Sequence, residues 1–203
     1  MTTTHRHRSV ARIVIAALLI GATAVAVSAV RSRLPKRFEV VESGVLYRSA
    51  QPSADHIDRL AEAFGLKTIL IVRADESRRV SDEKGRARQR GVNVLHVPIA
   101  SRKPIPDDQV QQFFDCVDNP ASRPVLIHCS AGRHRTGYLC ALYRIERQGW
   151  SVERALEEML SFGFDRKSQS AVETQLRAYM ALRDRAAGEH AKTSAAMKEI
   201  PTP

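Results

Sequence analysis

The sequence predicts an α/β fold in which a mostly parallel central sheet is flanked by helices. Short apolar runs of the kind found in buried strands alternate along the chain with longer segments of helical periodicity. Such alternation is typical of parallel sheets that are covered by helices on both faces. A further observation, an uninterrupted apolar run near the N-terminus, predicts a membrane-spanning helix in addition to this fold.

The expected strands are short and the expected helices lie between and after them. Ser53 and Ser151 are suitable N-caps, and Gly65 and Gly149 are suitable helix ends. Apolar runs place strands at residues 45–47, 68–72, 92–98 and 125–128. We expect helices at 53–63 and 107–117, a charged helix or loop at 76–90 and a helix ending at Arg147. Two amphipathic helices should follow, one with Val152, Leu156, Met159 and Leu160 on one face and a last one carrying Val172, Leu176, Tyr179 and Met180.

The N-terminal apolar run covers residues 13–30 and has arginines on both sides. A helix of this length rises about 27 Å, which is close to the hydrocarbon thickness of a bilayer. Small residues at 24–29 would also permit cleavage of a signal peptide. The length of the run and the arginines that follow it favour an uncleaved anchor. A buried helix of a soluble domain is disfavoured, because the run has no polar face.

Charge and composition divide the chain into five segments. The net charge is +10, but residues 1–37 contain seven lysines and arginines and no acidic residue, which leaves about +3 for the rest. With few aromatic residues to stack on bases, this pattern does not indicate nucleic-acid binding. We expect a basic segment at 1–12, the anchor or signal at 13–30, a linker at 31–40, one folded domain at 41–187, and a disordered tail at 188–203.

The most informative motif is HCSAGRHRTG at residues 128–137, between an expected strand and an expected helix. The backbone N–H groups of such a loop converge on one anion, and the N-terminus of the helix adds partial positive charge there. Cys129 lies at the floor of this loop, where nearby cations lower the pKa of its thiol and favour the nucleophilic thiolate. The planar guanidinium of Arg135 is suited to hold two phosphate oxygens at once.

The remaining residues of the motif are candidates for binding the substrate phosphate. Gly132 lets the backbone approach the anion without a Cβ atom. The hydroxyl of Thr136 is placed to hydrogen-bond the sulfur and to help it leave, while His128 is expected to orient the loop through backbone contacts. Candidate substrate-binding residues are therefore Ser130, Ala131, Gly132, Arg133, His134 and Thr136, with Cys129 and Arg135 as catalytic residues.

The motif resembles the signature of the protein tyrosine phosphatases, in particular the small dual-specificity-like members. The resemblance covers residues 40–185 and includes GVLYRSAQP at 44–52, QGWS at 148–151 and ALEEM at 155–159. It implies the cysteine-phosphatase fold, a phosphocysteine intermediate at Cys129, phosphate binding by the backbone of 130–135, Arg135 as a clamp, and no metal or other cofactor. The family includes small bacterial periplasmic tyrosine phosphatases.

The sequence departs from the family at the general acid, the group that protonates the leaving oxygen. The family has an aspartate in a loop upstream of the cysteine, whereas residues 100–106 here contain no carboxylate. Asp107 is the first candidate, although it is also a suitable helix N-cap. Asp108 and Asp75 are the alternatives.

Three functional hypotheses follow. The first is a phosphatase of phosphotyrosine proteins, anchored in a bacterial inner membrane with its catalytic domain in the periplasm. The second is a phosphatase of inositol polyphosphates or pyrophosphates, because the GRHRTG stretch is similar to the GKHRTG of phosphatases that act on those compounds. The third is a phosphate-binding module without catalysis. Cys116 and Cys140 are expected to be core residues, with a regulatory disulfide to Cys129 left open.

Overall fold

The structure is a computed structural model, and it describes residues 34–198. The predicted basic segment at 1–12 and the predicted anchor at 13–30 lie outside the described residues. Within residues 34–198, no helix combines the length and the apolar character that crossing a bilayer requires.

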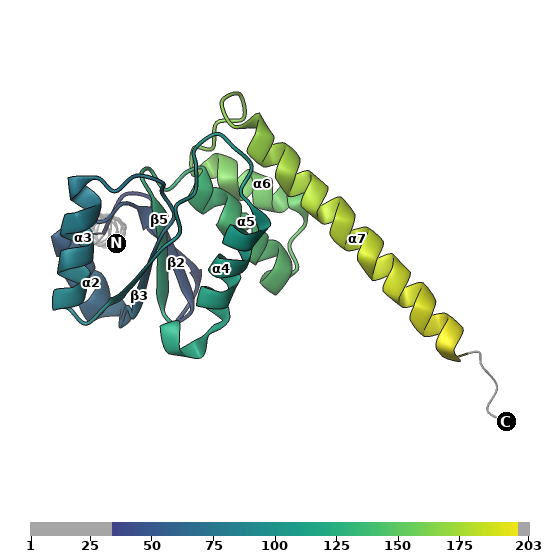
Figure 1. Ribbon diagram of the computed structural model, residues 1–203, viewed down its shortest axis with the longest axis horizontal. Coiled ribbons are helices and arrows are strands. Elements are labelled where there is room, and N and C mark those ends of the chain that lie inside the picture. The colour runs from purple at the N-terminus through teal and green to yellow at the C-terminus, as the bar shows by residue number, and fades with distance from the viewer. Residues whose placement is uncertain (1–33, 199–203) are drawn as a thin grey trace, which may run out of the picture.

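A five-stranded mixed sheet forms the centre of the domain (Figure 1). The strands β2, β5, β3 and β4 run parallel to one another, and the edge strand β1 pairs with β2 in the antiparallel sense. The sheet order is β1 (Glu39–Glu42), β2 (Leu46–Ala50), β5 (Val125–Cys129), β3 (Thr68–Ile71) and β4 (Asn93–His96).

The predicted parallel strands are confirmed, but β1 was not predicted. The sequence analysis assigned residues 31–40 to a linker and overlooked this strand, whose EVVE sequence has only a weak apolar pattern. An edge strand of this kind is held by its neighbour: Glu39 pairs with Arg48 and Val40 with Tyr47. The ordered domain therefore includes part of the predicted linker.

Helices cover both faces of the sheet (Figure 1). One face carries α2 and α3, whose buried side chains form a core with Ile69, Ile71 and Leu126. A larger core lies on the opposite face, under α4, α5, α6 and the first turns of α7. The helices are α2 (Ala54–Phe64), α3 (Arg78–Gln89), α4 (Asp107–Asp118), α5 (Arg135–Gln148), α6 (Val152–Ser161) and α7 (Ser170–Lys198), with a short 3₁₀ turn η1 (Pro120–Ser122) after α4.

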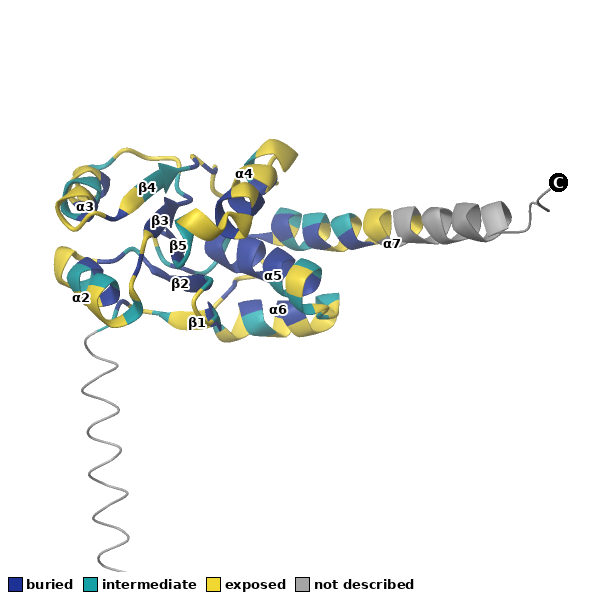
Figure 2. Cartoon of the chain, turned by 90° about the horizontal axis from the view of Figure 1, so that it is seen from below, coloured by how far each residue is buried: buried dark blue, intermediate teal, exposed yellow. Residues whose placement is uncertain are grey.

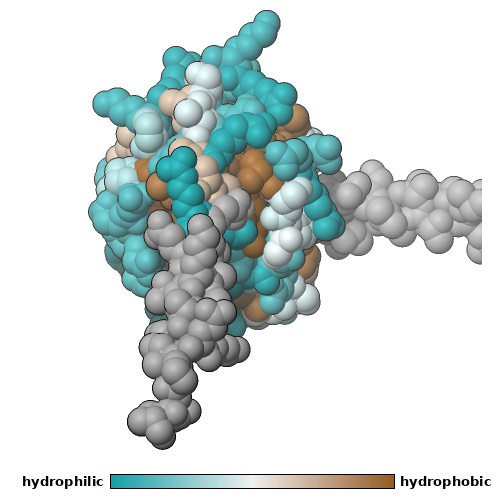
Figure 3. All heavy atoms as spheres, turned by 90° about the vertical axis from the view of Figure 1, so that its right-hand side faces the viewer, coloured by the Kyte–Doolittle hydropathy of each residue, from teal (hydrophilic) through white to brown (hydrophobic). Residues whose placement is uncertain are grey.

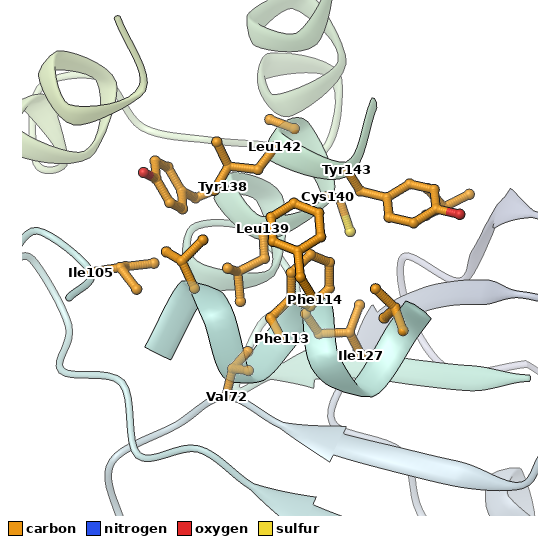
Figure 4. Packing of buried hydrophobic residues seen from close by; sticks show 14 of the residues in the cluster. Val72, Ile105, Phe113, Phe114, Ile127, Tyr138, Leu139, Cys140, Leu142 and Tyr143 are labelled. Atoms are coloured by element: carbon orange, nitrogen blue, oxygen red, sulfur yellow. The ribbon is translucent and has the colours of Figure 1, made fainter. Parts of the chain in front are cut away.

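The larger core is built around α4 and α5 (Figure 4). Phe113 and Phe114 of α4 pack together with ring centroids 5.0 Å apart. Leu139 and Leu142 of α5 are fully buried in the same cluster. Because α5 begins directly after the loop that follows β5, this packing fixes the start of α5 against the sheet.

The helix ends follow the predicted signals with one exception. The Ser53 side chain accepts a hydrogen bond from the His56 backbone N–H, and Ser151 caps α6 in the same way. Gly149 ends α5 in the left-handed conformation, as predicted. The exception is α4, whose N-cap is Pro106. Asp107 is instead the first helical residue and makes no capping bond, because a proline with extended ψ already turns the chain into the helix.

Two further expectations at the C-terminal end are corrected. Leu160, expected on the apolar face of α6, is 37% exposed, because α6 turns Ala155, Leu156 and Met159 inward instead. The predicted disordered tail from 188 is helical as far as Lys198. The alanines, Glu189 and Lys192 of this segment have high helix propensity, which outweighs the single Gly188.

Helix α7 leaves the body of the domain after its first turns (Figure 2). Val172, Leu176 and Met180 are buried against the core, whereas Leu182 is 66% exposed. The first turns of α7 therefore belong to the core.

Figure 3 shows the face toward which α7 points. Hydrophilic residues cover most of this face, and apolar side chains reach the surface in patches between them.

Candidate active site

The motif at 128–137 forms a tight loop at the carboxyl end of β5, where α5 begins. We call residues 129–135 the phosphate loop. Gly132 has φ +67°, and a Cβ atom there would lie 2.5 Å from the Ser49 carbonyl oxygen at the end of β2. Only glycine therefore allows the phosphate loop to rest against β2 in this conformation.

Carbonyl groups of the phosphate loop are held from outside by three donors. Arg48, fully buried in β2, donates from Nη2 to the Gly132 oxygen at 3.1 Å and pairs through Nη1 with Glu158 at 3.3 Å. Arg37 donates to the Ala131 oxygen at 3.2 Å. The backbone N–H of Gln51 donates to the Ser130 oxygen at 3.2 Å.

The thiol of Cys129 is 3% exposed and lies on the inner side of this loop. Burial alone raises the pKa of a thiol. Here hydrogen bonds from the Thr136 side chain and backbone, the charge of Arg135, and the Gly132 backbone N–H outweigh burial and lower the pKa of Cys129 to about 7. Among the described residues, the buried Thr136 hydroxyl has no hydrogen-bond partner besides the thiol. The site therefore favours a thiolate at neutral pH.

Arg135 is the first residue of α5, so its side chain starts beside the thiol. Its Nη1 donates to the Ile99 carbonyl oxygen at 3.0 Å, which links the phosphate loop to the loop at 98–106. The guanidinium keeps further N–H groups with which it can bind an anion in a forked geometry.

Arg133 and His134 pack against the segment that joins α6 to α7. The Nε2 of His134 accepts a hydrogen bond from the Asp165 backbone N–H at 3.4 Å, and its ring meets Phe164 edge-on. Burial and then the charge of Arg133 lower the pKa of His134. The Arg133 side chain passes close to Gly163, and its buried Nε has no hydrogen-bond partner within residues 34–198. Ser130, by contrast, is exposed.

The candidates for the general acid differ in their surroundings. Asp107 and Asp108 are exposed in the first turn of α4. Asp107 lines a pocket with Tyr138 of α5 and with the first turns of α7. Asp75 forms a two-bond ion pair with Arg73, at 2.7 and 2.5 Å, and these bonds hold the pKa of Asp75 below its usual range. A carboxylate held in this way is a poor proton donor, which argues against Asp75.

The other two cysteines are buried and free. Burial raises the pKa of Cys116 and of Cys140 to about 11. Both remain thiols at neutral pH, in agreement with the expectation that they are core residues.

Sequence reasoning predicted the loop itself but missed some of the residues that support it. His128 orients the loop as expected, with its Nδ1 3.0 Å from the Cys129 carbonyl oxygen. Its other ring nitrogen lies 2.5 Å from a carboxylate oxygen of Glu83 in α3, a contact that was not predicted. Arg48 lies one position beyond the strand expected at 45–47, and a cation buried there must find buried acceptors.

Known proteins resemble this chain along most of its length. The Saccharomyces cerevisiae inositol diphosphatase Siw14 is 31% identical over 134 residues, which are 64% of this chain and 46% of Siw14. The Pseudomonas aeruginosa dual specificity protein phosphatase TpbA is 31% identical over 160 residues, 74% of this chain and 70% of TpbA. The chain thus aligns with less than half of Siw14 and about two thirds of TpbA.

Solved structures of the same two proteins resemble the fold. The Siw14 catalytic core superposes with a TM-score of 0.62 at 28% identity and covers 71% of this chain and 85% of that structure. TpbA in complex with phosphotyrosine gives a TM-score of 0.55 at 32% identity, covering 66% and 78%. The model of the tyrosine phosphatase family matches residues 34–190, which include the whole phosphate loop and the elements that support it. The chain belongs to the tyrosine phosphatase family.

Proposed function

We propose that this protein is a cysteine-dependent phosphatase that hydrolyses phosphomonoesters, phosphotyrosine in proteins first of all, through a phosphocysteine intermediate at Cys129. One observation carries the proposal: a buried thiol whose pKa is lowered to about 7 lies at the floor of a loop that leads directly into a helix. Such a loop stabilises two anions, the thiolate and the phosphate.

The proposed reaction has two steps. The Cys129 sulfur attacks phosphorus, so that the S–P bond forms as the P–O bond to the leaving group breaks and a general acid protonates that oxygen. Water then attacks phosphorus and gives a proton to the conjugate base of that general acid, the S–P bond breaks, and the thiolate leaves with the Thr136 hydroxyl as its hydrogen-bond donor. Arg135 binds two equatorial phosphate oxygens in both steps, and the backbone of residues 130–135 binds the third.

We assign the general acid to Asp107. It is exposed and, among residues 34–198, has no ion-pair partner of the kind that holds Asp75 as an anion. A tyrosine leaving group has a pKa of about 10, so it gains much from protonation. Asp107 is therefore expected to matter most for phosphotyrosine and other poor leaving groups.

A second candidate substrate is a phosphoanhydride on a small polyphosphorylated molecule, such as an inositol pyrophosphate. The observation in its favour is the loop at 98–106, which offers Arg102 and Lys103 where the family has an acid. A phosphate leaving group has a second pKa of about 6 and departs without a general acid. Among the relatives, Siw14 is named an inositol diphosphatase and TpbA a dual specificity protein phosphatase, so each of the two substrate classes has a relative.

The first test is turnover of p-nitrophenyl phosphate by the full-length protein in the presence of a chelator. Cys129→Ser is expected to remove activity by at least about 10⁴-fold, because the nucleophile is lost. Cys116→Ser is the matched control, since its thiol is buried and stays protonated. An active Cys129→Ser variant contradicts the mechanism, and an inactive but folded wild type favours the phosphate-binding module.

The substrate is then decided by comparing a phosphotyrosine peptide with an inositol pyrophosphate at equal concentration. A higher kcat/KM for the peptide supports the first substrate class. A preference of tenfold or more for the pyrophosphate, about 1.4 kcal/mol of transition-state binding, assigns the second.

We also propose that residues 13–30 anchor the enzyme in a bacterial inner membrane, with the catalytic domain in the periplasm. The apolar run and the arginines on both sides of it support an anchor. Full-length protein that stays with membranes after alkaline extraction, and that protease digests in spheroplasts, is the expected result. A mature N-terminus within residues 24–33 would instead identify a cleaved signal peptide.

A further inference from the structure

Glu83 of α3 is a buried carboxylate that the proposed mechanism does not use. It is 3% exposed, and its Oε1 lies 2.5 Å from Nε2 of the fully buried His128. Its Oε2 accepts a hydrogen bond from the Gln51 side-chain amide at 2.9 Å. A carboxylate in such a place is strongly destabilising unless both of its oxygens have partners.

The hydrogen-bond partners limit the proton positions in this pair. The Cys129 carbonyl oxygen is only an acceptor, so Nδ1 of His128, 3.0 Å away, carries a hydrogen. The 2.5 Å contact between Nε2 and Glu83 needs one more proton. Two arrangements supply it: a carboxylate that accepts from an imidazole protonated at both nitrogens, or a carboxylic acid that donates to a neutral ring while its carbonyl oxygen accepts from Gln51.

We propose that Glu83 is a positioning residue for the nucleophile. It keeps His128 doubly protonated, so that the ring donates to the Cys129 carbonyl and places a positive charge next to the thiolate. The inference rests on the proposed role of Cys129 as the nucleophile, and it adds a residue from a helix outside the sequence motif.

Gln51 extends this support across the carboxyl ends of three parallel strands. Its backbone N–H donates to the Ser130 oxygen of the phosphate loop at 3.2 Å, and its side-chain oxygen accepts from Arg73 at 2.5 Å. Gln51 follows β2, Arg73 follows β3, and His128 lies in β5. One connected polar network therefore joins Glu83 to the loop both through His128 and through Gln51.

Other charged groups face the network, but each of those described has its own partner or lies toward solvent. Arg73 is paired with Asp75. The groups beside Glu83 on α3 are the exposed Arg79 and Asp82. His96 hydrogen-bonds to the Arg73 carbonyl and pairs with Glu76, and Glu76 also pairs with Lys84. Arg135 acts on the thiol from the other side.

The test is the Glu83→Gln variant of the full-length protein. Its amide oxygen can accept from Gln51, and its amide N–H can donate to Nε2 of a neutral ring, so all the hydrogen bonds are retained while the extra proton is lost. The readout is the rate of iodoacetamide alkylation at Cys129 against pH, followed by mass spectrometry. This measures the thiolate without turnover, so it stays separate from the test of the phosphatase reaction.

The midpoint of that profile, at a pKa of about 7 in the wild type, is expected to rise by about one pH unit in Glu83→Gln. Activity is expected to fall about tenfold near pH 6 and to change little near pH 8.5, where the thiolate forms anyway. Asp82→Asn is the matched control, because it removes the same charge from the adjacent, exposed position of α3. An unchanged midpoint, an equal loss at both pH values, or an equal shift in Asp82→Asn would overturn the proposal.

A measurement on the wild type decides the question if Glu83→Gln does not fold. In protein labelled with ¹⁵N-histidine, both ring nitrogens of His128 are expected to carry protons at neutral pH. A His128 ring with one unprotonated nitrogen contradicts the proposal directly.

Discussion

The phosphate loop and the loop at 98–106 lie on either side of the same arginine, yet they are held very differently. Three donors, Arg37, Arg48 and Gln51, bind consecutive carbonyl groups of the phosphate loop, and one of them, Arg48, is completely buried. The middle of the other loop, residues 101–104, is exposed. Arg102 there has φ +60°, a conformation that is unfavourable for a residue with a side chain.

The contacts that hold the 98–106 loop are near its ends. Arg135 donates to the Ile99 oxygen, and Gln175 of α7 exchanges two hydrogen bonds with the backbone of Ile105, at 2.8 and 2.5 Å. In the proposed mechanism, the half of the site that would bind phosphate is therefore preorganised, whereas the half that would meet the leaving group is open. Attack on phosphorus would then be set by well-packed parts of the fold, and protonation of the leaving group would depend on a few exposed residues.

Arg135→Lys is the strongest way to test the connection between the two loops. A lysine cannot bind two phosphate oxygens in a fork and also reach Ile99, so we expect kcat/KM to fall about 10²- to 10³-fold. Steady-state kinetics with p-nitrophenyl phosphate measure this loss. Arg147→Lys, which alters an ion pair on the outside of α5, should leave the rate unchanged; a comparable loss there would point to a general effect of the substitution.

Gly132→Ala tests how strictly the phosphate loop is preorganised. The new methyl group would lie 2.5 Å from the Ser49 oxygen, so the loop must move. A displacement of about 1 Å at a catalytic group costs about 100-fold in rate, and we expect a loss of that size in kcat. The free energy of unfolding should fall as well.

Gly85→Ala provides the comparison for Gly132. Gly85 lies within α3 and nothing is within 4 Å of its added Cβ. It should raise the free energy of unfolding by about 0.5–1 kcal/mol at unchanged activity. If Gly132→Ala behaved like Gly85→Ala in denaturation and kinetics, the loop would not be tightly seated.

Asp107→Asn examines the open half of the site. Loss of a general acid is expected to slow hydrolysis of a phosphotyrosine peptide about 100-fold, and to have little effect on a phosphoanhydride. Asp108→Asn, one position further along the same helix turn, is the control. Equal rates for wild type and Asp107→Asn on phosphotyrosine would remove Asp107 from the mechanism.

Gln175→Ala should have the smallest effect. It removes both hydrogen bonds to Ile105 but touches neither the thiol nor Arg135. We expect kcat to fall about two- to fivefold, since each bond contributes only about 1 kcal/mol to the position of the loop. Thr174→Ala, exposed on the adjacent position of α7, is the control. A loss as large as that of Arg135→Lys would show that the 98–106 loop is as rigidly required as the phosphate loop.

The sequence allowed the phosphate loop to be predicted because its motif consists of ten consecutive residues. The residues that support it could not be found in the same way. Arg48 and Glu83 are 84 and 45 positions away from the groups they bind, and the register that pairs Ser49 with His128 and Ala50 with Cys129 brings β2 to the loop. Parallel pairing of this kind is set by tertiary packing and leaves no local pattern.

The errors in the sequence analysis also have physical causes. β1 was missed because an edge strand needs hydrogen bonds from its neighbour more than an apolar sequence of its own. The cap of α4 was assigned to Asp107 because side-chain capping was expected, whereas the backbone of Pro106 begins the helix. The helix beyond Gly188 was missed because a small, polar composition suits both a disordered tail and a helix.

Arg37 has a practical consequence for how this enzyme is produced. It precedes the first strand, yet it donates to the Ala131 oxygen of the phosphate loop and to the Phe162 oxygen before α7, at 3.2 and 3.0 Å. A shortened protein that begins at the first strand would lack these two hydrogen bonds from Arg37. Poor activity of such a fragment would reflect a loosened loop rather than a need for the membrane, so expression boundaries belong at or before Leu34.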